Sequence, residues 1–178
     1  MLPLLMRLIS FSIVLSMAGV ALGQQTAAKP ADASSAQAGA QYVGSDTCKN
    51  CHEELFNGLR STPHVNLLKE GKKVGGVEVH GCESCHGPGS LHVEGGGDVT
   101  KIISFKSLSV QDASARCLTC HSSGPEHANF TRSSHATNGI GCLNCHSPHH
   151  AKTEHALLQQ TTPLLCYQCH TEQRAEFS

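Results

Sequence analysis

Five copies of the pattern Cys-x-x-Cys-His carry the chemistry of this chain. The copies use all ten cysteines, namely Cys48, Cys51, Cys82, Cys85, Cys117, Cys120, Cys142, Cys145, Cys166 and Cys169. The histidines that close them are His52, His86, His121, His146 and His170. This pattern is the attachment sequence of c-type haem, in which two thiols bond to the porphyrin and the histidine binds the iron. The motifs therefore predict five covalently bound c-type haems.

Two other uses of paired cysteines compete with haem. Structural zinc sites accept two Cys-x-x-Cys units, and an exported chain with an even number of cysteines can pair them as disulfides. Neither use requires a histidine directly after every second cysteine. Because that histidine recurs five times and no cysteine is left over, the pattern favours haem over zinc and over disulfides.

The second axial ligand of each iron helps to separate electron transfer from catalysis. The three methionines, Met1, Met6 and Met17, all lie within the first 23 residues, so histidine is the available ligand in an exported chain. Of the 13 histidines, eight lie outside the motifs. We expect the distal ligands to be His64, His92, His127, His135 and His149.

Two histidine ligands on every iron would close all five haems to small molecules, which is the coordination of an electron carrier. His92 and His149 follow their nearest motifs so closely that we expect each to serve a neighbouring haem. The remaining histidines, His80, His150 and His155, are expected to be surface residues.

The N-terminus has the features of a secretory signal peptide at residues 1–23. Arg7 supplies a positive charge, an apolar run follows over residues 8–22, and small residues near Gly23 allow cleavage. The run is short of the roughly 20 residues that a transmembrane helix needs, although an uncleaved anchor is the alternative. Residues 24–41 are small and polar and predict a flexible linker. We therefore expect a periplasmic protein without a transmembrane span in its mature form.

Residues 42–178 are predicted to form one pentahaem domain. The chain has no Trp, two Tyr and five Phe, too few aromatic residues to build a large core without the porphyrins. We therefore expect the haem-free chain to be largely unfolded, as small metal-dependent domains are. The formal net charge of −1 disfavours nucleic acid as a partner.

The spacing of the motifs predicts short helices and long loops. Ser109 and Asp112 predict the start of a helix that runs into Cys117–His121. A second helix is predicted from Ser45 or Asp46 to Leu59, and a third from Thr162 and Pro163 toward Ala175. No segment alternates apolar and polar residues as a strand does. The predicted fold is a haem-nucleated domain, mainly α with extensive irregular loops and little or no sheet.

The sequence around the motifs resembles a known family. The stretches CESCHGPGSLH (82–92) and SSHATNGIGCLNCHSPH (133–149) are its most specific parts, and the likeness covers nearly everything from Tyr42 onward. The chain resembles the MtrA/DmsE-type periplasmic multihaem cytochromes and, more distantly, the pentahaem electron donor of the cytochrome c nitrite reductase system. The positions that match ligands of the family are His64, His92, His127, His135 and His149.

The resemblance implies a redox protein that receives electrons from one protein partner and passes them to another. Its donor would be a membrane quinol-oxidising cytochrome, and its acceptor an outer-membrane conduit or a terminal reductase. The family usually carries ten haems in two pentahaem halves, so the chain is either a stand-alone pentahaem protein or the first half of a decahaem one.

Two other functions compete with electron transfer. A reductase of nitrite, hydroxylamine or a sulfur oxyanion would need one iron with an open face, and the chain contains no Cys-x-x-Cys-Lys variant. A structural subunit of a haem filament is the third interpretation. The plentiful histidines favour an electron carrier that is not an enzyme.

Overall fold

The computed structural model describes residues 37–125, 127–153 and 155–176. The predicted signal peptide and the predicted linker as far as residue 36 lie outside the described residues. The remaining linker residues contact the domain: the Gln37 side chain donates to the carbonyls of His86 and Pro88, and Gln41 pairs with Ser90. Within the described residues, no helix is both long and apolar enough to cross a bilayer.

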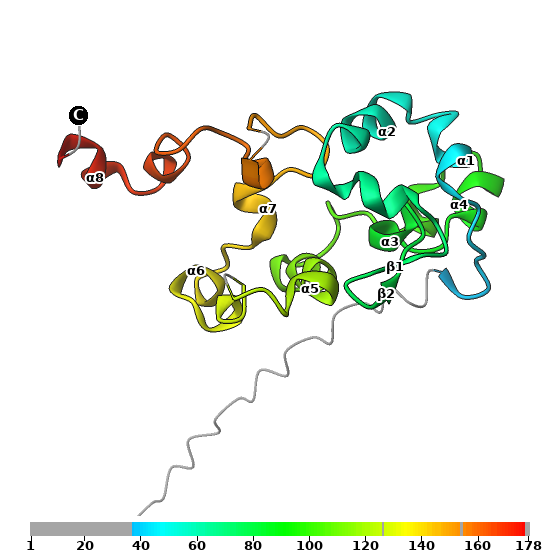
Figure 1. The fold of residues 1–178 in the computed structure, drawn as a ribbon, viewed down its shortest axis with the longest axis horizontal. Coiled ribbons are helices and arrows are strands. Elements are labelled where there is room, and N and C mark those ends of the chain that lie inside the picture. The colour runs from blue at the N-terminus through cyan, green and yellow to red at the C-terminus, as the bar shows by residue number, and fades with distance from the viewer. Residues whose placement is uncertain (1–36, 126, 154, 177–178) are drawn as a thin grey trace, which may run out of the picture.

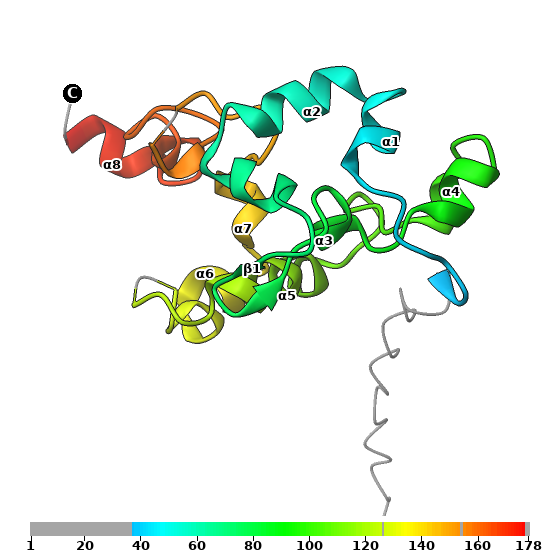
Figure 2. The same ribbon diagram turned by 45° about the vertical axis from the view of Figure 1, so that its right-hand side comes forward.

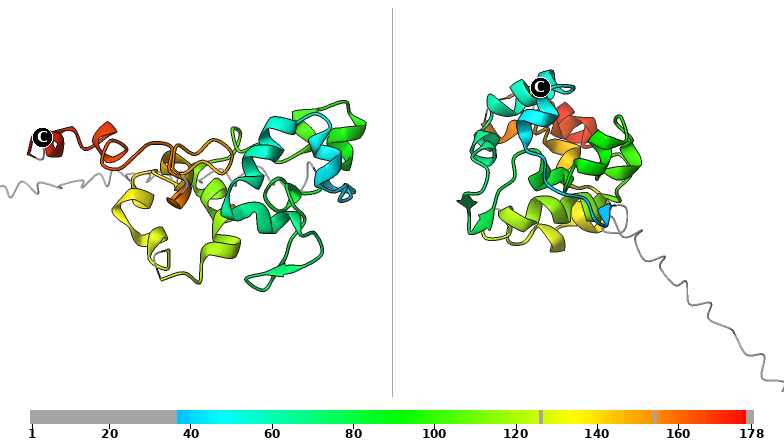
Figure 3. Two further views of the ribbon diagram at one scale, coloured as in Figure 1. Left: turned by 45° about the horizontal axis from the view of Figure 1, so that its top comes forward. Right: turned by 90° about the vertical axis from the view of Figure 1, so that its right-hand side faces the viewer.

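Short helices follow one another along the long axis of the molecule. Figure 1 shows α1 to α4 at one end, α5 to α7 in the middle and α8 at the other end, and the same order is seen in Figure 2 and in the left-hand view of Figure 3. The α-helices are α1 (Ser45–Lys49), α2 (Glu53–Arg60), α3 (Glu83–His86), α4 (Ser90–Glu94), α5 (Val110–His121), α6 (Ser134–Thr137), α7 (Cys142–Cys145) and α8 (Thr171–Glu176). The 3₁₀ turns are η2 (Pro63–Leu68), η3 (Val99–Lys101), η4 (Phe130–Arg132), η5 (His155–Leu157) and η6 (Cys166–Gln168).

The helix predicted from Ser109 is confirmed as α5, the longest of the described helices. Ser109 is its N-cap, and the Ser109 hydroxyl accepts from the backbone N–H of Asp112 at 3.1 Å. The cap satisfies one of the N–H groups that the first turn leaves without a partner. The helix ends at His121, so the third motif occupies its last turns.

The other two predicted helices differ in the structure. The helix expected over residues 45–59 is two helices, because His52 leaves the helical conformation and becomes the N-cap of α2. The helix expected from Thr162 toward Ala175 is wrong as a continuous element: it is a turn, then η6, then α8. Leu164 remains 49% exposed, so this stretch lacks the packed apolar face from which a protein helix draws most of its stability.

The sheet content matches the prediction. Its single described sheet pairs β1 (Lys73–Val74) with β2 (Val77–Glu78), antiparallel, across the Gly75-Gly76 turn. Both glycines have positive φ, which two-residue hairpin turns require. The predicted fold class, mainly helical with extensive loops and little sheet, is confirmed.

The protein core is small. Among the described residues, the buried apolar side chains are Leu59, Val79, Ile103, Ala113 and Leu157. The Glu83 carboxylate, 2% exposed, adds a polar anchor by accepting from the backbone N–H groups of Val43, Gly44 and Gly89. Five buried apolar residues cannot offset the conformational entropy of a chain this long.

We therefore expect the chain to be largely unfolded when it is produced without haem attachment. Far-ultraviolet circular dichroism and limited proteolysis of haem-free and haem-loaded protein would test this prediction. A haem-free chain with the helical signal and protease resistance of the loaded protein would contradict it.

Candidate haem sites

Each Cys-x-x-Cys-His motif is wound into one helical turn. The N–H of the motif histidine bonds to the carbonyl of the first cysteine in four motifs: His52 to Cys48, His86 to Cys82, His146 to Cys142 and His170 to Cys166. The other motif lies within α5 and has the same helical conformation. Side chains three and four positions apart in a helix share one face. The turn therefore presents two thiols and an imidazole together, as attachment to one porphyrin requires.

The described side chains form neither a disulfide nor a cluster of zinc ligands. All ten cysteines are free thiols. Within the described ranges, no three His, Cys, Asp or Glu side chains converge as a structural zinc site would require. The thiols remain available for thioether bonds to a porphyrin.

Four motif histidines face a second histidine from a distant part of the chain. The ring centroids are 6.3 Å apart for His52 and His92 and 6.4 Å apart for His86 and His149. The corresponding separations are 6.0 Å for His121 and His64 and 6.1 Å for His170 and His135. Four of the five predicted distal ligands are thus placed opposite a motif histidine, and neither His92 nor His149 faces the motif directly before it.

These separations are those of two imidazoles that share one metal ion. A metal–nitrogen bond of about 2 Å on each side, together with about 1.2 Å from each nitrogen to its ring centre, places the two centroids about 6 Å apart. The four pairs therefore fit an iron held between two histidines.

Backbone carbonyls orient three of the imidazoles. Nδ1 of His86 lies 2.9 Å from the carbonyl oxygen of Ile103, and Nδ1 of His92 lies 2.9 Å from that of Asp98. Nδ1 of His146 lies 2.6 Å from the carbonyl oxygen of Ala156. A metal-binding histidine commonly donates its other N–H to such a carbonyl, which fixes the tautomer. Nε2 is then left for the metal in all three residues.

Burial keeps several of these imidazoles neutral. Desolvation lowers the pKa values of His64, His86 and His149 below the ordinary histidine value. A neutral imidazole has the free lone pair that metal binding requires. Nδ1 of His64 is buried without a hydrogen-bond partner, so no carbonyl fixes the tautomer of this ring.

Two histidines approach the third motif. His127 lies 5.4 Å from His121, on centroids, whereas His64 lies at 6.0 Å. The His64 separation is nearer to that expected across a metal ion. An apolar hollow beside this motif, lined by Leu118, Phe130 and Ile140 among others, offers a surface of the kind that a porphyrin face packs against.

The fourth motif differs from the others, because no described imidazole ring contacts His146.

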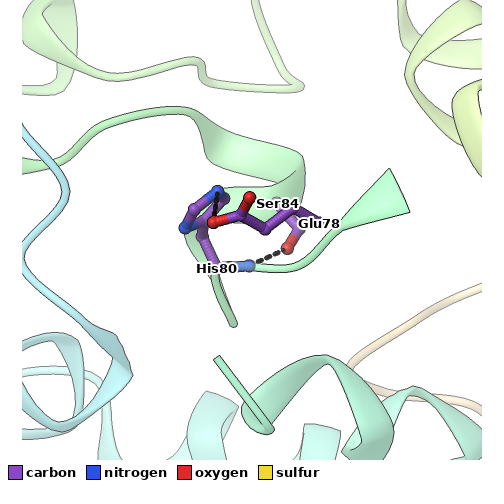
Figure 4. Close-up of polar contacts among 3 residues, drawn as sticks. All are labelled: Glu78, His80 and Ser84. Atoms are coloured by element: carbon purple, nitrogen blue, oxygen red, sulfur yellow. Dashed lines mark hydrogen bonds and ion pairs between the residues drawn. The ribbon is translucent and has the colours of Figure 1, made fainter. Parts of the chain in front are cut away.

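The structure describes the side chains of two of the three histidines that were expected at the surface. The His80 ring stacks on Tyr42 at 3.9 Å. Figure 4 shows its other contacts: the ring lies 3.8 Å from a Glu78 carboxylate oxygen, and the backbone N–H of His80 donates to the Ser84 hydroxyl. His150 is exposed. The side chain of His155 lies outside the description.

Sequence reasoning did not anticipate the carbonyls of Ile103, Asp98 and Ala156. A backbone carbonyl carries no residue-type signal, and its position depends on how the loops fold. Only the position of Asp98 in the glycine-rich loop after His92 offered a sequence clue.

Comparison with known proteins agrees with the haem-attachment motifs. Residues 135–175 match a family described as a doubled CXXCH motif, and residues 92–147 match one described as cytochrome c554 and c-prime. The chain is 29% identical over 144 residues to multiheme cytochrome MtrA of Shewanella baltica (strain OS185), covering 76% of this chain and 40% of that protein. No solved structure matches.

The motifs, their helical turns and these matches define a multihaem c-type cytochrome. Within that class the matches support a relation to the MtrA type. It spans 40% of the length of the relative that it matches.

Replacing a distal histidine with methionine tests the pairs. We expect His135→Met to raise the potential of one haem, because His/Met ligation gives a higher potential than two histidines, without loss of any haem. A spectroscopic redox titration would measure the change. His80→Met is the matched control, since His80 packs on Tyr42, and it should change no potential. A titration curve unchanged in His135→Met would contradict the pairing with His170.

Proposed function

We propose that the chain is a periplasmic electron carrier with five covalently bound c-type haems, and not an enzyme. It would accept electrons from a membrane quinol-oxidising cytochrome and pass them to an outer-membrane conduit or a terminal reductase. The observation that carries the proposal is the placement of four motif histidines opposite a second imidazole. An iron with two histidine ligands has no position for a substrate.

The side chains of the protein hold, orient and close the proposed sites. The thiol pairs would fix the attachment points, and the motif histidine and its facing histidine would occupy both axial positions. The carbonyls of Ile103 and Asp98 would hold His86 and His92 in the tautomer that leaves Nε2 for the iron. When bound, haem supplies one-electron chemistry, in which iron alternates between Fe(III) and Fe(II).

The order of the elements along the molecule supports a linear path for electrons. The first motif lies between α1 and α2 at one end of the molecule, and the fifth precedes α8 at the other (Figures 1 and 2). A donor and an acceptor could therefore dock at opposite ends without overlapping. This separation suits a carrier that relays electrons between two proteins.

A second candidate function is favoured by the fourth motif alone. Because no described imidazole faces His146, the iron of this motif is the one at which a small ligand could bind. That iron could reduce nitrite, hydroxylamine or a sulfur oxyanion, whereas the four paired sites could not.

Carbon monoxide binding to the reduced protein separates the two functions. We expect CO to change the visible spectrum of at most one haem in five, because four irons have two histidine ligands. No change supports the electron carrier. A change worth one haem supports an open iron at the fourth motif, to be tested with the oxyanion substrates. Binding of CO to several wild-type haems would contradict the proposed function.

A pair of variants calibrates this measurement. His92→Ala removes the imidazole that faces His52 and should add one CO-binding haem to the wild-type number. His80→Ala should add none, because its ring packs on Tyr42.

A further inference from the structure

The first two motifs are joined by the same contact as the third and fourth. Ser45, three residues before Cys48, is 5% exposed, and its hydroxyl accepts from the backbone N–H of Cys82 at 3.2 Å. Ser114, three residues before Cys117, is also 5% exposed and accepts from the backbone N–H of Cys142 at 3.3 Å. Each buried hydroxyl thus connects the start of one motif to the start of the next.

A glycine permits the contact in both places. A Cβ atom at Gly81 would lie 1.7 Å from the Ser45 hydroxyl oxygen, and one at Gly141 would lie 2.7 Å from that of Ser114. Only glycine lets the serine approach the following cysteine so closely. Gly81 also has a φ of +58°, which favours glycine on conformational grounds.

As free thiols, the first cysteines of the joined motifs lie close enough to shift each other's pKa values. A hydrogen bond with Cys48 lowers the pKa of Cys82 to about 6 and raises that of Cys48. Burial, followed by the neighbouring Cys142 thiol, raises the pKa of Cys117 to about 12. The Cys48 and Cys117 thiols also make equivalent contacts, each to the carbonyl four residues earlier, at 3.6 and 3.5 Å.

These contacts identify a repeated unit in the sequence. Ser-x-x-Cys-x-x-Cys-His followed by Gly-Cys-x-x-Cys-His begins at Ser45 and again at Ser114. The fifth motif has Pro163 at the serine position. The first four motifs are therefore two copies of a two-motif unit.

We propose that Ser45 and Ser114 are positioning residues that hold the two haems of each unit as a closely coupled pair. The inference rests on the proposed function, since it requires haem at these motifs. The first cysteine of each motif bonds to one edge of its porphyrin, so a serine hydroxyl that joins the starts of two motifs brings two porphyrin edges together. Coupling within a unit then depends on a single serine hydroxyl.

The test compares three variants of the haem-loaded protein. Ser45→Ala and Ser114→Ala remove the hydroxyls, and Ser109→Ala is the matched control, because Ser109 caps α5 without contacting a cysteine amide. Mass spectrometry counts the haems. Circular dichroism in the Soret band measures coupling, because nearby haems give a signal with two lobes of opposite sign.

We expect Ser45→Ala and Ser114→Ala each to keep five haems and to lose about half of the two-lobed signal, since distant sites contribute independently. Ser109→Ala should lower the unfolding temperature and leave the signal unchanged. An unchanged signal in both Ser45→Ala and Ser114→Ala would overturn the proposal, because the hydroxyls would then have only a structural role.

Two further results keep the test decisive. If Ser45→Ala and Ser114→Ala lose haem while Ser109→Ala does not, electron paramagnetic resonance of the oxidised wild type decides whether the haems of a unit are coupled. Magnetically coupled haems support the proposal, and five isolated signals overturn it. A wild-type protein with fewer than five haems, or with CO bound at several of them, would instead overturn the proposed function.

Discussion

The pairing of histidines across the chain is the constraint on which the rest of the structure depends. His52 faces His92, His86 faces His149, His64 faces His121 and His135 faces His170. Each pair joins two segments that lie far apart in the sequence, with several short elements between them. Because the described core contains few apolar side chains, a metal ion held between paired rings would supply cross-links that the polypeptide lacks. The short helices then serve mainly to aim side chains.

The chemistry of the motifs could be predicted from the sequence, because it depends on residues that are adjacent in the chain. The N-cap of α5 could be predicted for the same reason, since Ser109 and Asp112 are three residues apart. The β1–β2 hairpin was not predicted, although the Gly75-Gly76 pair between valines is a local signal for such a turn. In the motifs and the α5 cap the geometry is set within a few residues, and sequence reasoning succeeds there.

The pairing itself could not be predicted, because it depends on how long loops fold back. Nothing near His64 indicates that it approaches His121 rather than another motif. The continuous helix expected after Thr162 was wrong for a related reason: its capping residues were suitable, but tertiary packing was absent and Leu164 remained exposed. The orienting carbonyls of Ile103 and Ala156 likewise have no signature in residue type.

On the proposed periplasmic location, the direction of the pairs has a consequence for how the protein is assembled during export. A chain that crosses the membrane N-terminus first delivers His52 before His92, and His86 long before His149. It delivers His64 before His121, and His135 before His170. On the proposed ligation, the irons of the first two motifs would wait with one open face while the chain emerges, whereas those of the third and fifth would find their second histidine already present. The early haems of the nascent chain would thus be the ones exposed to oxidants and competing ligands in the periplasm.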